Sequence, residues 1–464
     1  MRHKVYQNYL LAVLTVSLAF NYVDRLTLGL LLQEIKTDLV LSDTQLGVIT
    51  GFAFAIFYSL TSIPIARWAD RGNRVSIIGI ATVIWTVAVT LCGYVNSFVQ
   101  LAGVRIGAAI AEAGSMPPAH SLIADYFSRA ERPKAMAVYL AGGSLSFAIG
   151  YFLTGWLNEF YGWRWTFRIL AVPGLVLAGL VWLTLIEPRT RGLRTERPGS
   201  AVHADAMRSN AVQSKDAPGL REVIATLWHN KTFRQLLAYL SVIGFFTSGI
   251  GQWQPAFFIR SHELSTGALG TWLALLLGAG GVVGTYFGGA WASRYAPDDE
   301  RRQLRVMVGV VAGVGVLSPF IYLAHDVRVA FGLLGLSSVV GTTASGPLFA
   351  TIQTLVPERM RATSIALIFL FANLIGMGLG PMFVGTLSDV LRPWAGEESL
   401  RYALLALSPG YFWAAWHVWL ASRTVRNDMK NTTVEAERDP GKLGRVPLSH
   451  PTGDPTRHPR YLEA

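Results

Sequence analysis

The chain has 464 residues, of which 52% are hydrophobic and only 15% are charged. Soluble domains carry about 25% charged residues, so this composition excludes a soluble fold and indicates a protein that spans a membrane. The net charge of +11 does not indicate a nucleic-acid partner, because the basic residues are dispersed over loops instead of forming a cluster.

Twelve stretches of about 20 apolar residues follow one another, each long enough to cross a bilayer as a helix. Six are predicted near residues 9–31, 44–67, 75–95, 99–125, 134–157 and 164–186. Six more are predicted near residues 233–258, 267–293, 305–324, 327–355, 361–387 and 401–422. The first stretch continues through Asp24 and Arg25 without a cleavage site, so we expect a retained helix and not a signal peptide.

Two polar regions divide and end the chain. Residues 187–231 are rich in Arg, Ser and Pro, which is typical of a linker. Residues 424–464 have no apolar period and are expected to form a disordered tail. The sequence therefore predicts one bundle of six helices in residues 1–186 and another in residues 232–423.

The orientation in the membrane is predicted from the basic residues. When the twelve stretches are threaded alternately through a bilayer, most of the 40 Lys and Arg residues fall on one side. Cytoplasmic loops retain positive charge, so both termini, the linker and the tail are predicted to be cytoplasmic, in a multi-pass plasma (inner) membrane protein.

The single cysteine, Cys92, excludes a disulfide framework and a cysteine-cluster metal site, and no metal is expected.

Four charged residues lie inside apolar stretches: Asp24 and Arg25 in the first, Arg105 and Glu112 in the fourth. A charge at membrane depth costs about 2.5 to 3.5 kcal/mol on insertion scales, so such residues face a cavity lined by protein. Arg105 and Glu112 are two helical turns apart and share one face. Counting from the ends of the stretches places Glu112 near mid-membrane, and we expect all four to meet in one central cavity.

These residue types suit proton coupling. The protonation of a buried carboxyl group depends on whether an arginine lies beside it. We therefore predict that Glu112 and Asp24 exchange protons, while Arg105 or Arg25 pairs with them or with an anionic substrate, which a guanidinium binds bidentately. The alternative is that Asp24 with Arg25, and Arg105 with Glu112, are merely structural pairs, although adjacent helical residues point about 100° apart.

The two halves of the chain repeat one another weakly, as in transporters built from duplicated bundles. Segment Glu131–Ala135 corresponds to Glu358–Ala362, and Ala66–Arg71 corresponds to Gly289–Arg294. A third match, at one constant offset, pairs Gly150, Gly155 and Glu159 with Gly380, Gly385 and Asp389. Three matches in the same order indicate a duplication.

The duplicated layout and the segments Ala66–Arg74 and Glu131–Lys134 resemble the major facilitator superfamily over about residues 5–423. That family's loop between helices 2 and 3 carries Gly, three residues, Asp-Arg, one residue, Gly and then basic residues. The corresponding positions here are Ala66, Asp70, Arg71, Asn73 and Arg74, followed by Val75 where the family has a further basic residue. Two glycines of the pattern are thus replaced.

A narrower resemblance concerns the spinster branch of that family. The first helix carries Asn21-Tyr22-Val23-Asp24-Arg25-Leu26-Thr27, which is similar to the spinster signature in the same helix. Arg105 and Glu112 in helix 4, and Asn73 in the loop, are also similar to that branch.

The resemblance implies an all-α polytopic membrane protein with twelve transmembrane helices in two pseudo-symmetric six-helix bundles, the major facilitator fold. It implies a monomer that works by alternating access, in which Asp70 and Arg71, with Arg74, form a cytoplasmic gate. A solvated loop is the alternative for these three residues.

His120, after Pro117-Pro118, is a candidate second proton site because histidine titrates near neutral pH. A hydrogen-bonded structural histidine is the alternative.

The sequence thus predicts a proton-coupled secondary transporter. No nucleophile-and-base constellation indicates an enzyme, no phosphate-binding loop indicates ATP as the energy source, and no cofactor is expected. The spinster resemblance implies a lysolipid or related amphiphile as substrate, and a small organic anion such as an aromatic carboxylate is the alternative. Protons and membrane lipids are the other expected partners.

In the second half, polar and aromatic residues are assigned collectively to substrate contact: Gln252, Trp253, Gln254, Tyr286, Thr342, Thr343, Asn373, Trp413 and Trp416.

Overall fold

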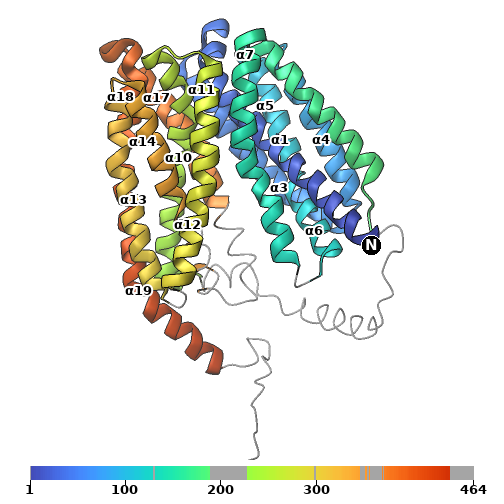
Figure 1. Ribbon diagram of the computed structural model, residues 1–464, viewed down its shortest axis with the longest axis vertical. Coiled ribbons are helices and arrows are strands. Elements are labelled where there is room, and N and C mark those ends of the chain that lie inside the picture. Colours follow the sequence, from blue (N-terminus) through green and yellow to red (C-terminus); the bar gives the residue numbers. More distant parts are fainter. Residues whose placement is uncertain are drawn as a thin grey trace, which may run out of the picture.

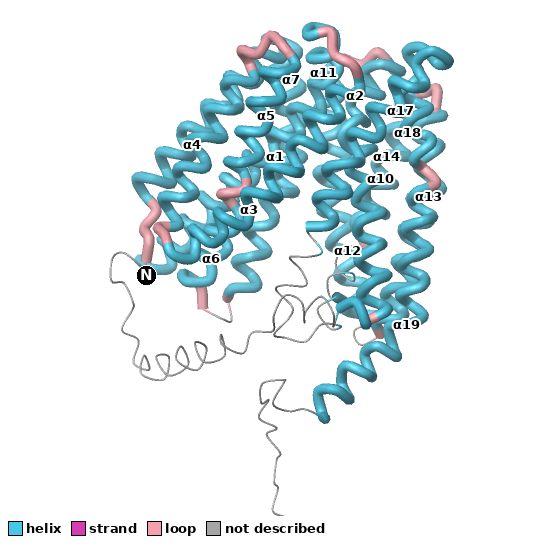
Figure 2. Tube along the Cα trace, turned by 180° about the vertical axis from the view of Figure 1, so that it is seen from behind, coloured by secondary structure: helices cyan, strands magenta, loops and turns pink. Residues whose placement is uncertain are grey.

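In the computed structural model, all regular structure of the described residues is helical (Figures 1 and 2). The structure describes residues 2–128, 131–188, 227–296, 299–344 and 370–438, together with residues 348, 351, 352, 355 and 368. Most of the predicted linker and the repeat segment Glu358–Ala362 lie outside these ranges.

The first bundle contains the helices before the linker. They are α1 (Arg2–Leu39), α2 (Asp43–Gly47), η1 (Val48–Ala53), α3 (Phe54–Arg71), α4 (Arg74–Cys92), α5 (Phe98–Glu112), α6 (Met116–Tyr126) and α7 (Arg132–Thr184).

The second bundle follows the linker. Its helices are α10 (Lys231–His262), α11 (Thr266–Leu273), η2 (Ala274–Ala279), α12 (Gly280–Tyr295), α13 (Glu300–Leu323), α14 (Val327–Thr342), η4 (Ala372–Leu379), α17 (Gly380–Ala395), η5 (Gly396–Glu398), α18 (Ser399–Leu407) and α19 (Gly410–Arg438). Helix α19 thus continues past residue 424, where we expected the disordered tail to begin, and the tail from residue 439 lies outside the described residues.

Among the described residues, eight helical stretches are long and apolar enough to cross a membrane. Two of them reverse direction partway, Lys134–Thr184 at Gly162 and Ala372–Met429 at Gly396. The φ angles of these glycines, 76° and 57°, lie in the left-handed region that favours glycine. Helices α5 with α6, and α14, supply further apolar passes. This arrangement is consistent with the predicted twelve.

Side-chain caps start several of these helices where the sequence leaves a short loop. Ser42 and Gln45 form a reciprocal capping box at α2, and Ser97, Asn73 and Ser265 accept a backbone N–H of the first turn of their helices. Each cap satisfies a donor that has no partner within the helix. The polar residues between apolar stretches therefore fix where the membrane helices begin.

The two bundles lie side by side and diverge toward the end of the molecule that holds the N-terminus (Figures 1 and 2). They meet where α2 contacts α17, where α7 contacts α11, and along α1 and α10. We call the end with the α2–α17 and α7–α11 contacts the closed end.

Candidate functional site

The four charged residues predicted to share a cavity do lie together, in two ion pairs that link α1 to α5. Arg25 donates from Nε and Nη2 to Oε2 of Glu112 at 2.8 and 2.5 Å. Arg105 donates from Nη1 to Oδ2 of Asp24 at 2.6 Å. The pairs are therefore crossed between helices, and the alternative pairing of Asp24 with Arg25 and of Arg105 with Glu112 is wrong.

The crossing follows from helix geometry. Asp24 and Arg25 point about 100° apart on α1, and the seven-residue spacing on α5 separates Arg105 from Glu112 by about 10 Å. Asp24 and Arg25 consequently each bind a different residue of α5. We refer to Asp24, Arg25, Arg105 and Glu112 as the four-residue site.

Burial distinguishes the members of this site. Asp24, Arg105 and Glu112 are 3%, 2% and 4% exposed, whereas the side chain of Arg25 is 21% exposed. Asp24 Oδ1, Arg105 Nε and Glu112 Oε1 are buried without a hydrogen-bond partner among the described residues. Buried polar atoms are rarely unpaired in stable structures, so this site keeps hydrogen-bonding capacity that its own pairs do not use.

Aromatic rings surround the accessible arginine. The Arg25 guanidinium lies 4.5 Å from the ring centre of Phe54, 5.2 Å from that of Tyr22 and 5.4 Å from that of Tyr58. Its Nη1 lies 3.7 Å from Sδ of Met377, which belongs to η4 in the second bundle. Cation–π attraction holds such a guanidinium in place, and the site presents one positive group among apolar surfaces.

Helix 4 of the predicted set is broken at the site, just before the proline pair Pro117-Pro118. Glu112 is the last residue of α5, and α6 begins at Met116 with Pro117 in its first turn. Discontinuous helices near mid-membrane are typical of transporter binding sites. The eleventh predicted stretch is likewise irregular, because its segment Ala372–Leu379 is π-helical.

His120 does not join the four-residue site. Its ring packs edge-on against Tyr139, with 5.5 Å between ring centres, and its Nε2 is buried without a hydrogen-bond partner among the described residues. A second proton site at His120 stays a prediction.

The predicted cytoplasmic gate has a different arrangement for Arg74. This side chain is fully buried and binds Glu187 at 2.5 Å and Asp125 at 2.6 Å, with a further bond to Ser121. All these partners belong to the first bundle, so Arg74 fastens α4 to α6 and to the segment that follows α7. A role of Arg74 in the cytoplasmic gate stays a prediction. Arg71 is exposed, and the side chain of Asp70 lies outside the described part.

The residues of the second half that were assigned to substrate contact do not form one group. Trp253 is fully buried and donates from Nε1 to the carbonyl oxygen of Pro381 at 2.8 Å, a structural role. Tyr286, Trp413 and Trp416 are more than half exposed. Gln252 approaches α1 at Gly29, and its Nε2 is buried without a partner among the described residues.

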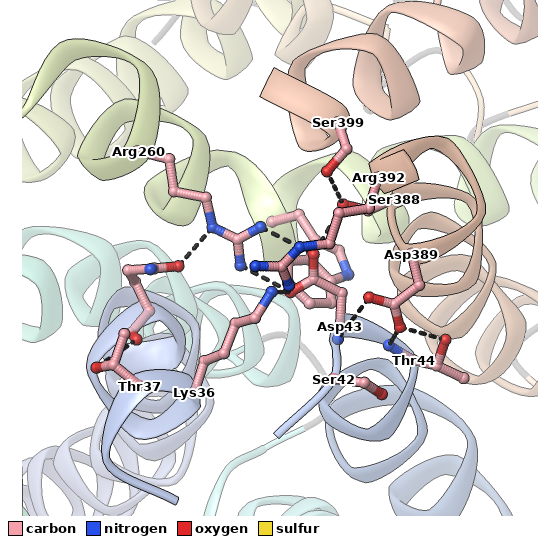
Figure 3. Close-up of polar contacts among 12 residues, drawn as sticks. Lys36, Thr37, Ser42, Asp43, Thr44, Arg260, Ser388, Asp389, Arg392 and Ser399 are labelled. Carbon is pink, nitrogen blue, oxygen red and sulfur yellow. Dashed lines mark hydrogen bonds and ion pairs between the residues drawn. The ribbon is translucent and has the colours of Figure 1, made fainter. Parts of the chain in front are cut away.

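Sequence reasoning missed a polar network at the closed end (Figure 3). Asp43 is fully buried and accepts from Lys36 at 2.6 Å, from Ser388 at 2.7 Å, and from both terminal nitrogens of Arg260 at 2.7 and 2.8 Å. Arg260 and Ser388 belong to the second bundle, so this network joins the bundles. The only signal in the sequence was charge at the ends of three apolar stretches, where charge is inexpensive.

We predict that Arg105→Ala lowers the free energy of unfolding by about 3 to 5 kcal/mol, because it leaves the Asp24 carboxylate buried without its cation. Adding Asp24→Asn should recover part of this loss, with a coupling energy of about 0.5 to 3 kcal/mol. Thermal unfolding in detergent measures both. The matched control is Arg164→Ala, which breaks a partly exposed ion pair with Asp38 worth about 0 to 1 kcal/mol.

We also predict that Arg74→Ala destabilises the first bundle by about 3 to 5 kcal/mol, because it breaks a buried ion-pair network by removing the guanidinium that binds Glu187 and Asp125. Arg71→Ala, at an exposed position of the same loop, should change stability by no more than about 0.5 kcal/mol. Unfolding monitored by tryptophan fluorescence separates the two variants. Equal stability of both would contradict the structural role of Arg74.

The chain was compared with known proteins. The family model of the Major Facilitator Superfamily matches residues 14–426. The chain is 34% identical over 418 residues to an MFS-type efflux pump of Mycolicibacterium smegmatis, covering 90% of this chain and 93% of the pump. It is 25% identical over 411 residues to the probable L-galactonate transporter of Escherichia coli, covering 87% and 86%.

Among solved structures, the chain is similar to a bacterial homolog of the human lysosomal transporter Spinster in its inward-facing, unoccupied conformation. The two share 27% sequence identity with a TM-score of 0.76, over 91% of this chain and 98% of that chain. The fold, the sequence match and the family model agree: the chain belongs to the major facilitator superfamily of membrane transporters, and it resembles the spinster branch.

Proposed function

We propose that the protein is a proton-coupled secondary transporter that works by alternating access, with an amphiphile that carries an anionic head, such as a lysolipid, as its substrate. The observation that carries this proposal is the Arg25–Glu112 pair, in which the one accessible cation of the site is held by a buried carboxylate. No role is assigned to ATP or to a cofactor.

Competition for Arg25 supplies the coupling. A substrate carboxylate or phosphate that binds the Arg25 guanidinium displaces Glu112, whose carboxylate is then buried without its cation. A buried carboxylate without a partner is costly, and taking up a proton removes that cost. Substrate binding and protonation of Glu112 therefore favour one another, and this linkage acts equally in both directions.

The second pair has a supporting role in this proposal. Arg105 and Asp24 are both more buried than Arg25, so Arg25 is the better candidate for contact with the substrate. Asp24 has one unpartnered oxygen and is proposed as the second carboxylate that exchanges a proton. Arg105 then holds Asp24 in position on α1.

The aromatic surroundings support an amphiphilic substrate. Tyr22, Phe54 and Tyr58 flank the guanidinium, and they offer apolar and aromatic surface beside a single positive group. A molecule with an anionic head and an apolar body fits that combination. The resemblance to the spinster homolog supports the same class.

A small organic anion is the second candidate. It is supported by similarity to proteins named as L-galactonate and galactarate/D-glucarate transporters, at 25% and 27% identity. Both candidates present a carboxylate or phosphate to Arg25, so they differ in the body of the substrate and not in its charged group.

We predict that liposomes containing the protein take up one of these classes when a pH gradient is imposed. The screen should compare labelled lysolipids, galactonate and an aromatic carboxylate, with an uncharged sugar as negative control. Arg25→Lys should weaken binding roughly tenfold or more, because it keeps the charge but loses a charge-assisted hydrogen bond worth about 1.5 kcal/mol. Transport of the uncharged sugar, or normal affinity in Arg25→Lys, would contradict anion recognition by Arg25.

We predict that Glu112→Gln abolishes accumulation driven by the pH gradient while exchange of labelled for unlabelled substrate without a gradient persists. The amide cannot take up the transported proton, yet it leaves Arg25 free to bind the anion. Glu397→Gln is the matched control, because Glu397 is an exposed carboxylate whose side chain is 77% accessible. Gradient-driven uptake that survives in Glu112→Gln would show that the proton role belongs elsewhere.

A further inference from the structure

The first turn of α2 is capped from both bundles at the closed end. Ser42 of the same bundle accepts from the N–H of Gln45. Asp389, on α17 in the second bundle, accepts from the N–H of Asp43 at 3.1 Å and from the N–H and hydroxyl of Thr44 at 2.7 Å each (Figure 3). The helical span Asp43–Ala69 thus has its free donors satisfied by a carboxylate that belongs to the other half of the molecule.

The first turn of α11 has the same arrangement with the bundles exchanged. Ser265 accepts from the N–H of Ala268 within the second bundle. Glu159, on α7 of the first bundle, accepts from the N–H of Gly267 at 3.1 Å, and the Thr266 hydroxyl lies 3.4 Å from the same oxygen. Each bundle therefore supplies one carboxylate to a helix start of the other.

A glycine one helical turn before each carboxylate permits this approach. A Cβ at Gly385 would lie 2.2 Å from the carbonyl oxygen of Asp43, and a Cβ at Gly155 would lie 2.5 Å from that of Thr266. Any larger residue would push the opposing helix start away. The repeat seen in the sequence, Gly155 with Glu159 and Gly385 with Asp389, is thus a pair of matching contacts across the two-bundle interface.

The two contacts differ in strength. On the α2 side, Asp389 satisfies two backbone donors and a hydroxyl, and the adjacent Asp43 is also held by Arg260 of the second bundle. On the α11 side, Glu159 satisfies one backbone donor, beside the neutral Thr266. A carboxylate at a helix start also interacts favourably with the helix dipole. The α2 side should therefore resist separation more strongly.

We propose that Asp389 and Glu159 form a two-part latch that holds the closed end shut and sets the ratio of its closed to its opened conformation. Neither carboxylate can keep its backbone donors once α2 leaves α17 and α11 leaves α7. The two are therefore positioning residues for the conformational change, separate from the four-residue site. The inference requires only that the bundles separate at the closed end, and it does not depend on which substrate or ion is carried.

The latch is tested by measuring the distance between spin labels across the closed end. Cys92 is the only cysteine of the chain and is replaced by alanine, after which Val99 and Val329 are replaced by labelled cysteines. These residues lie at the starts of α5 and α14 and are 75% and 53% exposed, so labels there should not disturb packing. Pulsed electron paramagnetic resonance then gives the fractions of short and long distances.

Glu159→Ala should raise the ratio of long to short distances roughly fivefold, the usual effect of removing one helix cap, and Asp389→Ala should raise it more. Because the two contacts are separate, the double variant should combine both effects, roughly 25-fold or more. Asp389→Asn keeps one acceptor oxygen and should fall between the unchanged chain and Asp389→Ala.

The matched control is the double variant Ser42→Ala and Ser265→Ala. It removes a cap from each of the same helix starts, but both caps lie within one bundle and persist when the bundles separate. It should lower the thermal unfolding midpoint and leave the distance ratio unchanged. An unchanged ratio in the Asp389 and Glu159 double variant, or an equal shift in the serine control, would overturn the proposal, whether or not transport is proton-coupled.

Discussion

A charge inside a bilayer must be paired or face water, and this constraint organises the first bundle. Asp24 and Arg25 on α1 each find a partner of opposite charge on α5. These pairs exist only if α1 and α5 keep one rotation relative to each other, so the ion pairs fix the register of the two helices. Packing of the remaining helices around them then places the partly exposed Arg25 at the contact with the second bundle.

Polar contacts in this protein fall into two kinds, according to whether they stay within a bundle or cross between bundles. The four-residue site and the Arg74 network lie within the first bundle and can persist while the bundles move. The Asp43–Arg260 contact and the caps by Asp389 and Glu159 cross the interface. In the proposed alternating access, separation of the bundles at the closed end would break the second kind and keep the first, so rigidity and movement would be served by different residues.

The sequence allowed prediction of the family, of the helical fold and of the residues that form the four-residue site, because charge inside apolar stretches is rare and conspicuous. It did not predict the pairing, since that depends on how α1 and α5 are rotated relative to each other. The burial of Arg74 was not predicted, because sequence does not distinguish a buried arginine beside a loop from a solvated one. The Asp43 network was missed for the same reason, since its charges lie at span ends.

The contact between Arg25 and Met377 has a mechanical consequence. Met377 lies in a π-helical segment of the second bundle, and its sulfur touches the guanidinium that neutralises Glu112. Any displacement of that segment alters the packing around the guanidinium and hence the electrostatic field at Glu112. In the proposed mechanism, the side chain of Met377 thus connects the movement of one half of the molecule to the protonation of Glu112 in the other.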